Sequence, residues 1–231
     1  MEKTLSLADK LNFLWNDVIL FVKEGIAQGS FPKQISGNFK QLTRRDVADN
    51  DESPKLLPVC DSCISNCCSQ LSGKVVLSLI DVARLVDSGH ADAIDGSFRG
   101  FAKMLELYLE TGNVSVFGEM GVLVSDQLNH DYMPSLKKKG SRCFFLSERG
   151  RCEIYSVRPE SCRRFPFQYD HATKKISADA SCAGLEKVAG DKERIEATKE
   201  LLHAENERLK DMALLMLDAE RVAAIGFASY L

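Results

Sequence analysis

The sequence predicts an α+β fold in which a small cysteine-rich core, with a β-hairpin and short helices, is flanked by longer N- and C-terminal helices. Three observations support this prediction. All eight cysteines fall between residues 60 and 182, amphipathic patterns occupy both ends, and two short apolar runs surround a glycine-containing turn. We therefore divide the chain into an N-terminal helical extension and linker (1–56), a cysteine-cluster domain (57–187) and a C-terminal helix (188–231).

The N-terminal segment has the apolar spacing of an amphipathic helix. Its apolar residues recur at steps of three and four, which places them on one helix face. The residues on this face are Leu7, Leu11, Leu14, Val18, Phe21, Val22 and Ile26. Gly25 and Gly29 lie near the expected end of the helix, and the polar stretch 30–59 is typical of a linker.

The region after the first cysteines predicts a strand and then two helices. Residues 74–77 form a short apolar run, and Ser78 directly after it can cap a helix. Asp81 would lie in the first turn, where the helix dipole favours a carboxylate, and Gly89 is expected to stop the helix. A further helix is predicted over 97–111, where four apolar residues share a face.

The segment from 121 to 155 predicts short strands. Residues 121–124 are expected to form a strand, and 125–141 a loop with a basic end. The apolar runs 143–146 and 152–155 are separated by a polar stretch that contains Gly150. This pattern is typical of a β-hairpin with glycine in the loop.

A long helix is predicted from about residue 192 into the 220s. The apolar residues on one face are Ile195, Leu202, Leu209, Met212 and Met216. The second half of this helix is apolar nearly all round, which favours burial or contact with a partner. We therefore expect that the chain can form an oligomer through the C-terminal helix.

Composition and charge narrow the classes of partner and compartment. The net charge is −3 and the pI is about 5.9, so we expect neither nucleic acid nor a membrane as partner. The longest apolar run near the start, 18–22, is too short to cross a bilayer, and no export signal is found. We therefore expect a cytoplasmic protein with reduced thiols, which favours metal binding over disulfides.

The first four cysteines combine two kinds of spacing. Cys60 and Cys63 are separated by two residues, which lets both thiolates bind one ion. Cys67 and Cys68 are adjacent, so their side chains are expected to diverge. Either one of the pair is a ligand and the other packs nearby, or the two bind different metals.

The other cysteines follow after a long gap. The expected hairpin brings Cys143 and Cys152 near each other. Pro159 fits the first position of a short helix that Pro166 ends, so Cys162 would lie in its first turn. There the helix dipole and neighbouring arginines favour the thiolate that binds metal. The candidate metal ligands are Cys60, Cys63, Cys67, Cys68, Cys143, Cys152, Cys162 and Cys182.

Not every cysteine has to bind the same ion. The first choices are Cys60, Cys63, Cys67 and Cys162. One of the remaining four can instead lie beside the centre or belong to a second site. The four histidines are isolated in the sequence and are expected to be exposed or hydrogen-bonded, although His171 is the choice if one ligand is not cysteine. The neighbouring arginines are expected to compensate the charge of a thiolate centre.

The cysteines and the residues around them resemble a known family. The motifs that carry the resemblance lie at 60–68, 142–146, 150–155, 158–166 and 181–185. In this order they are similar to the YkgJ-type cysteine-cluster proteins, a family described as a zinc- or iron-chelating domain. Three residues rather than two separate Cys63 from Cys67, which leaves open whether Cys67 or Cys68 is the ligand, and Ala183 replaces the family's usual proline.

The resemblance implies a metal-binding protein. A similar domain occurs in flagellin lysine methylases, which are thought to carry an iron–sulfur centre. The leading expectation is one [4Fe–4S] iron–sulfur cluster in electron transfer, or in support of a redox or modification reaction, with a redox or protein partner. An iron–sulfur oxidoreductase would fit this expectation. The alternatives are a structural zinc module that binds another protein, and a protein-modifying enzyme similar to the flagellin lysine methylases.

Overall fold

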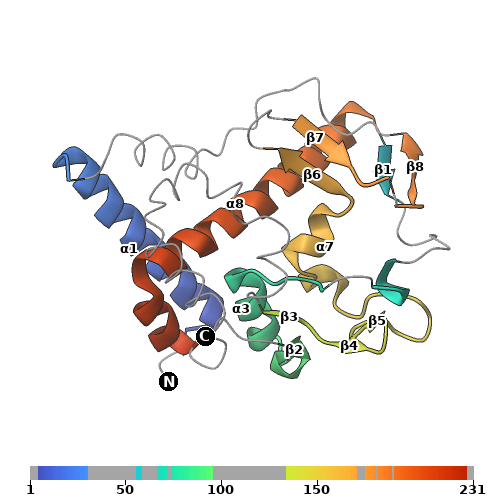
Figure 1. Ribbon diagram of the computed structural model, residues 1–231, viewed down its shortest axis with the longest axis horizontal. Helices are drawn as coiled ribbons and strands as arrows, with labels where there is room; N and C mark the ends of the chain where they lie inside the picture. Colours follow the sequence, from blue (N-terminus) through green and yellow to red (C-terminus); the bar gives the residue numbers. More distant parts are fainter. Residues whose placement is uncertain are drawn as a thin grey trace, which may run out of the picture.

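Helices and small antiparallel strand pairs make up the chain, which confirms the α+β class (Figure 1). The structure is a computed structural model. The residues that it describes are 5–30, 56–58, 67–71, 74–95, 134–170, 175–180, 182–188 and 190–227. The helix predicted over 97–111 and the strand predicted over 121–124 lie outside these residues.

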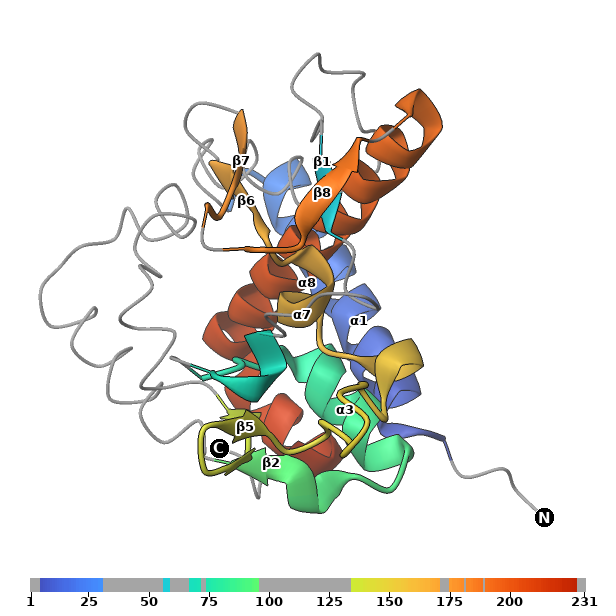
Figure 2. The ribbon, with the colours of Figure 1, turned by 90° about the vertical axis from the view of Figure 1, so that its right-hand side faces the viewer.

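The helices come from both ends and the centre of the chain. The α-helices are α1 (Leu7–Ala27), α3 (Leu79–Asp87), α7 (Glu160–Arg164) and α8 (Asp191–Val222). The shorter turns are the 3-10 helices η1 (Cys67–Ser69), η2 (Ala91–Ala93) and η3 (Tyr155–Val157) and the π-helical turn η4 (Ala223–Phe227). Helix α1 packs against α3 and α8, and α7 packs against α8 (Figure 2).

In the described part of the chain, the strands form four separate antiparallel pairs. The first two pairs are β1 (Leu56–Pro58) with β8 (Leu185–Val188), and β2 (Ile94–Asp95) with β3 (Ser135–Leu136). The other two are β4 (Lys138–Lys139) with β5 (Arg142–Cys143), and β6 (Phe167–Asp170) with β7 (Lys175–Ala178). Pairs this short gain little stability alone and depend on packing against the helices.

Helix α1 confirms the amphipathic prediction with one correction. Ser6 caps the helix, because its hydroxyl accepts a hydrogen bond from the backbone N–H of Asp9. Most of the predicted face is buried, but Phe21 is 60% exposed. Trp15 is buried in its place, because the packed face is rotated toward α3 and α8.

Helix α3 begins and ends where the sequence predicts. Ser78 and Asp81 form a reciprocal capping box, and Gly89 adopts a positive φ of 80° directly after the helix. The apolar residues of α3, except the partly buried Val86, are buried in a core that α1, α8 and the segment 143–154 share. Helix α3 therefore connects the terminal helices to the cysteine-rich part of the chain.

Two strand predictions are wrong in detail. In 74–77 only Val76 pairs, through an isolated bridge to Ser135, because the neighbouring backbone groups bond irregularly to the segment 134–136. The end of the predicted loop 125–141 instead forms β3 and β4. Hydrogen bonds to 75–77 and to Ala93 hold this segment in place.

The predicted hairpin is a chain reversal without two full strands. Gly150 adopts the expected positive φ of 73° in the turn. Only one bridge, between Leu146 and Cys152, joins the two runs, because Cys143 already pairs with β4 and the second run enters η3 at Tyr155.

Helix α8 confirms the predicted C-terminal helix, but its buried face is different. Ile195, predicted on the apolar face, is 37% exposed, whereas Leu201 is 1% exposed. The buried face also carries three carboxylates, Glu205, Glu207 and Asp211, which bond to basic side chains or to the backbone. A pattern based on apolar residues alone places the face incorrectly, because these paired carboxylates are buried too.

Among the residues that the structure describes, no helix has both the length and the apolar character needed to cross a bilayer.

Candidate metal centre

Six of the candidate cysteines lie in the described part of the chain. All six are free thiols, not disulfides: Cys67, Cys68, Cys143, Cys152, Cys162 and Cys182. Cys60 and Cys63, two of the first choices, lie outside the described residues. The position of the centre is therefore described from the other cysteines.

The adjacent pair Cys67 and Cys68 opens η1, which packs against β5. The backbone N–H of Leu71 donates to the carbonyl of Ser141 at 2.8 Å, which ties the end of this segment to the turn before β5. Cys67 is exposed, whereas Cys143 on β5 is 7% exposed. The thiols in this region therefore extend from the surface to the edge of the core.

The chain reversal after β5 brings the next cysteine back. The N–H of Leu146 donates to the carbonyl of Cys143 at 3.1 Å, and the N–H of Glu153 donates to the carbonyl of Phe145 at 3.0 Å. These bonds close the turn and place Cys152 beside Leu146, as the isolated bridge shows. The reversal therefore runs from Cys143, which pairs with β4, to Cys152, which pairs with Leu146.

Cys162 lies in α7, as the two prolines predict. Pro159 is the N-cap, and the helix ends at Arg164, before Pro166. The N–H of Cys162 donates to the carbonyl of Pro159 at 2.9 Å, which fixes the cysteine in the first turn. Burial raises the pKa of the Cys162 thiol well above its usual value, and negative charge on Cys143, Asp81, Cys152 and Cys67 adds to this effect.

The adjacent cysteines Cys67 and Cys68 interact with each other. A hydrogen bond between their side chains lowers the pKa of Cys67 to about 6 and raises that of Cys68. Both residues lie in the tight 3-10 turn of η1. The interaction favours the thiolate of Cys67, and which of the two binds metal stays a prediction.

The remaining thiols share one electrostatic neighbourhood. Burial raises the pKa values of Cys143 and Cys152, so both favour the neutral thiol. Negative charge on Cys67 would raise the pKa of Cys143 further, and charge on Cys143 that of Cys152. Lys139 and Arg158 act in the opposite direction and favour the thiolates. A bound cation would favour them too, and thiolates are the ligands of zinc and iron–sulfur centres.

Comparison with protein-family models decides the family. The model of the family "Putative zinc- or iron-chelating domain" (CxxCxxCC) matches residues 59–183, more than half of the chain and all eight cysteines. The chain belongs to this family. The resemblance found from the sequence motifs is therefore confirmed, and metal binding is the property that the CxxCxxCC domain supports. No solved structure matches the chain.

The cysteine thiols of the CxxCxxCC domain are suitable metal ligands, but the described side chains alone do not form a complete metal site. In the described residues, no three side chains of Cys, His, Asp and Glu are grouped closely enough to hold an ion. The available donors are free thiols that act on one another electrostatically. Cys60 and Cys63, which lie outside the described residues, belong to the same set of candidate donors.

Cys182 lies on a different element from the other described cysteines. It begins the turn before β8, where the N–H of Leu185 contacts its carbonyl at 3.4 Å. Strand β1 runs antiparallel to β8 and places Pro58 opposite Leu185.

The described histidines are not close to a group of metal donors. His90 is half-buried, and its ring makes an edge contact with Phe145 at 5.2 Å between centroids, so it is less solvated than the sequence suggests. His203 lies on α8, 4.0 Å from Glu207. His130 and His171 lie outside the described residues, so the choice of His171 as a ligand stays a prediction.

Two of the three arginines of the Cys162 segment have carboxylate partners. Arg164 forms an ion pair with Glu205 of α8, and Arg163 lies 3.9 Å from Glu160. Arg158 instead stacks over Tyr155, 4.0 Å from the ring centroid, and favours the Cys152 thiolate. These contacts fit the expected structural and charge-compensating roles.

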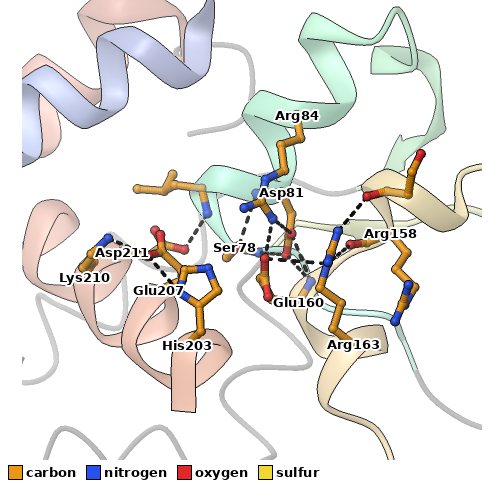
Figure 3. A network of polar contacts seen from close by, with 12 residues as sticks. Ser78, Asp81, Arg84, Arg158, Glu160, Arg163, His203, Glu207, Lys210 and Asp211 are labelled. Atoms are coloured by element: carbon orange, nitrogen blue, oxygen red, sulfur yellow. Dashed lines mark hydrogen bonds and ion pairs between the residues drawn. The ribbon is translucent and has the colours of Figure 1, made fainter. Parts of the chain in front are cut away.

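Sequence reasoning missed a buried polar network beside Cys162, drawn in Figure 3. It joins Asp81 and Arg84 of α3 to Glu160 of α7, and a second part joins Asp211 of α8 to the start of α3. Burial raises the pKa of Asp81 to about 6 and that of Asp211 well above its usual value. The capping motif of α3 signals Asp81 in the sequence, but nothing local signals its contact with α7, which is 79 residues away.

Proposed function

We propose that this CxxCxxCC domain binds a [4Fe–4S] cluster through cysteine thiolates and serves in electron transfer, or supports a redox or modification reaction, in the cytoplasm. The observation that carries the proposal is the match of the zinc- or iron-chelating domain to residues 59–183, which contain all eight cysteines. Five of these thiols come from η1, from β5 packed against it, from the following turn and from α7. Cys60 and Cys63 precede η1 by a few residues, so they can complete the ligand set. Four thiolates hold such a cluster.

The position of these thiols favours an electron-transfer role. Cys67 is exposed and Cys143 is buried, so a centre between them would lie close to the surface while one side packs against the core. Lys139 and Arg158 supply positive charge near Cys143 and Cys152. A four-thiolate centre is anionic, and nearby cations and apolar groups tune its potential.

Cys182 lies in the turn before β8, on a different element from the other described cysteines, which supports dividing the eight cysteines between two places. We propose that the described cysteines of η1, β5, the turn and α7 belong to the principal centre. Cys182, at the end of the β1–β8 pair, is then assigned to a second site or to the surroundings of the first. The second site would take zinc or a further cluster, since both accept thiolates.

The test is a metal and sulfide analysis of the protein purified without oxygen. We expect a brown protein with near-equal amounts of iron and acid-labile sulfide, and a visible spectrum that dithionite bleaches. A colourless protein with stoichiometric zinc and no sulfide would contradict the cluster and support the alternative, a zinc module that binds another protein. A protein without either metal would contradict metal binding itself.

A further inference from the structure

Helix α7, which carries Cys162, has no side-chain cap of its own. Its N-cap residue is Pro159, whose side chain cannot accept a hydrogen bond. The first N–H of the helix, that of Glu160, instead donates to the two carboxylate oxygens of Asp81 at 3.0 and 3.2 Å (Figure 3). A helix end leaves its first N–H groups without partners inside the helix, so a partner from elsewhere stabilises it.

The same carboxylate caps the helix that carries it. Asp81 also accepts a hydrogen bond from the N–H of Ser78 at 3.0 Å, in the capping box of α3. Asp81 is 2% exposed, so these bonds form away from solvent. One buried carboxylate therefore joins the N-termini of two helices, where the helix dipoles favour negative charge.

Two further contacts fix α7 against the same part of the chain. The side chain of Glu160 forms an ion pair with Arg84 of α3. The hydroxyl of Ser161 donates to the carbonyl of Val76 at 2.9 Å, just before α3. Since α7 has only five residues, its own hydrogen bonds do little to set its orientation.

We propose that Asp81 is a positioning residue of the metal centre, which holds the Cys162 thiol in its binding orientation by capping α7 from α3. Cys162 follows Glu160 by two residues in the same helical turn. A displacement of the helix start therefore moves the thiol directly. This inference rests on the proposed function, because it assigns Cys162 to the metal.

Asp211 of α8 provides a matched control. Its carboxylate accepts a hydrogen bond from the N–H of Leu79 at 2.5 Å, so it also caps α3, and it is also 2% exposed. Among the described contacts, none joins Asp211 to α7. Substitution of Asp81 or Asp211 thus removes a buried cap of α3, but only Asp81 reaches the helix of Cys162.

The experiment compares Asp81→Asn and Asp81→Ala with the same changes at Asp211. Metal affinity is measured by competition with a chromophoric chelator for zinc, and circular dichroism verifies the fold. We expect Asp81→Ala to weaken zinc binding about 10- to 100-fold, the range for residues that orient ligands. Asp81→Asn should lose less, because its amide oxygen still accepts one bond from Glu160. The Asp211 variants should stay within about threefold of the wild type.

A second readout does not require metal. In the metal-free protein, iodoacetamide labelling followed by mass spectrometry gives the alkylation rate of each cysteine. We expect Cys162 to react at least about tenfold faster in Asp81→Ala, because the half-buried thiol loses its fixed position. Loss of the Asp81 charge also lowers the pKa of Cys162, and Asp81→Asn, which loses this charge but keeps an acceptor for the N–H of Glu160, measures that effect alone. The rate of Cys162 in Asp211→Ala and the rate of Cys182 should not change.

The outcomes separate the inference from the proposed function. Equal losses of zinc affinity at Asp81 and Asp211 would overturn the positioning role and leave only a shared effect on α3. An unchanged Cys162 alkylation rate in Asp81→Ala would overturn it as well. If the wild type binds neither zinc nor iron, the proposed function fails, and the alkylation rates alone decide whether Asp81 holds Cys162. If Asp81→Ala does not fold, the comparison of Asp81→Asn with Asp211→Asn decides it.

Discussion

Replacement of Cys162 by serine is expected to remove most of the metal from the protein. Cys162 is a half-buried residue of α7, and nearby thiols act on it electrostatically. A serine hydroxyl is a poor ligand for zinc or iron at neutral pH, because it stays protonated. We expect metal affinity to fall by more than about 100-fold, the upper range for changes outside the ligand set.

The control is the same change at Cys182. It is also a free thiol, but it lies at the start of the turn before β8. We expect Cys182→Ser to retain the iron and sulfide of the principal centre. Metal content by elemental analysis and the visible spectrum check both variants. Retention of full iron and sulfide by Cys162→Ser, or their complete loss from Cys182→Ser, would contradict the proposed division of the cysteines.

Removal of the metal is expected to loosen the cysteine-rich segment and leave the helical core folded. The backbone of segment 138–157 is held by two-residue strands, one isolated bridge and a few turn bonds, and only its residues Cys143, Phe145, Leu146 and Ile154 are buried in the apolar core. Helices α1, α3 and α8 supply most of that core. Hydrogen exchange of the chelated and loaded proteins should therefore show fast amides in 142–157 and 160–164 after chelation, with protection retained in α3.

The same comparison gives a stability difference. A metal present at 100 times its dissociation constant stabilises the folded chain by about 2.7 kcal/mol. For a chain of this size that corresponds to a melting temperature about 5 to 10 °C higher in the loaded protein. Equal exchange and equal melting temperatures with and without metal would contradict a centre that orders these segments.

The elements that could be predicted from the sequence have strong local signals. The capping motif at Ser78, the positive-φ glycine at Gly89 and the two prolines around Cys162 fix the ends of α3 and α7, and the structure agrees at each. These signals act within a few residues, so no knowledge of the rest of the fold is needed.

The incorrect predictions concern residues whose surroundings come from distant segments. The buried face of α8 carries Asp211, which bonds to the backbone of Leu79, 132 residues away. The run 74–77 has the composition of a strand, yet its neighbours in the fold provide only a single bridge at Val76. In both places tertiary contacts override the local pattern.

The candidate site shows the same distinction. The cysteines themselves were identified from their spacing and from the family motifs, and the family is confirmed. Their arrangement could not be predicted, because it depends on how η1 packs against β5 and on where α7 lies. The contact of Asp81 with Glu160 was also out of reach, since it depends on how α3 and α7 meet.

The most direct test of the account is X-ray absorption at the iron and zinc edges of the anaerobically purified protein. If cysteine thiolates hold the metal, we expect a first shell of sulfur at about 2.3 Å, and a further iron–iron shell when the metal is a cluster. This result would show that cysteine thiolates, with sulfide where a cluster forms, hold the metal. A first shell of nitrogen or oxygen would contradict the central claim that this chain is built around a thiolate centre.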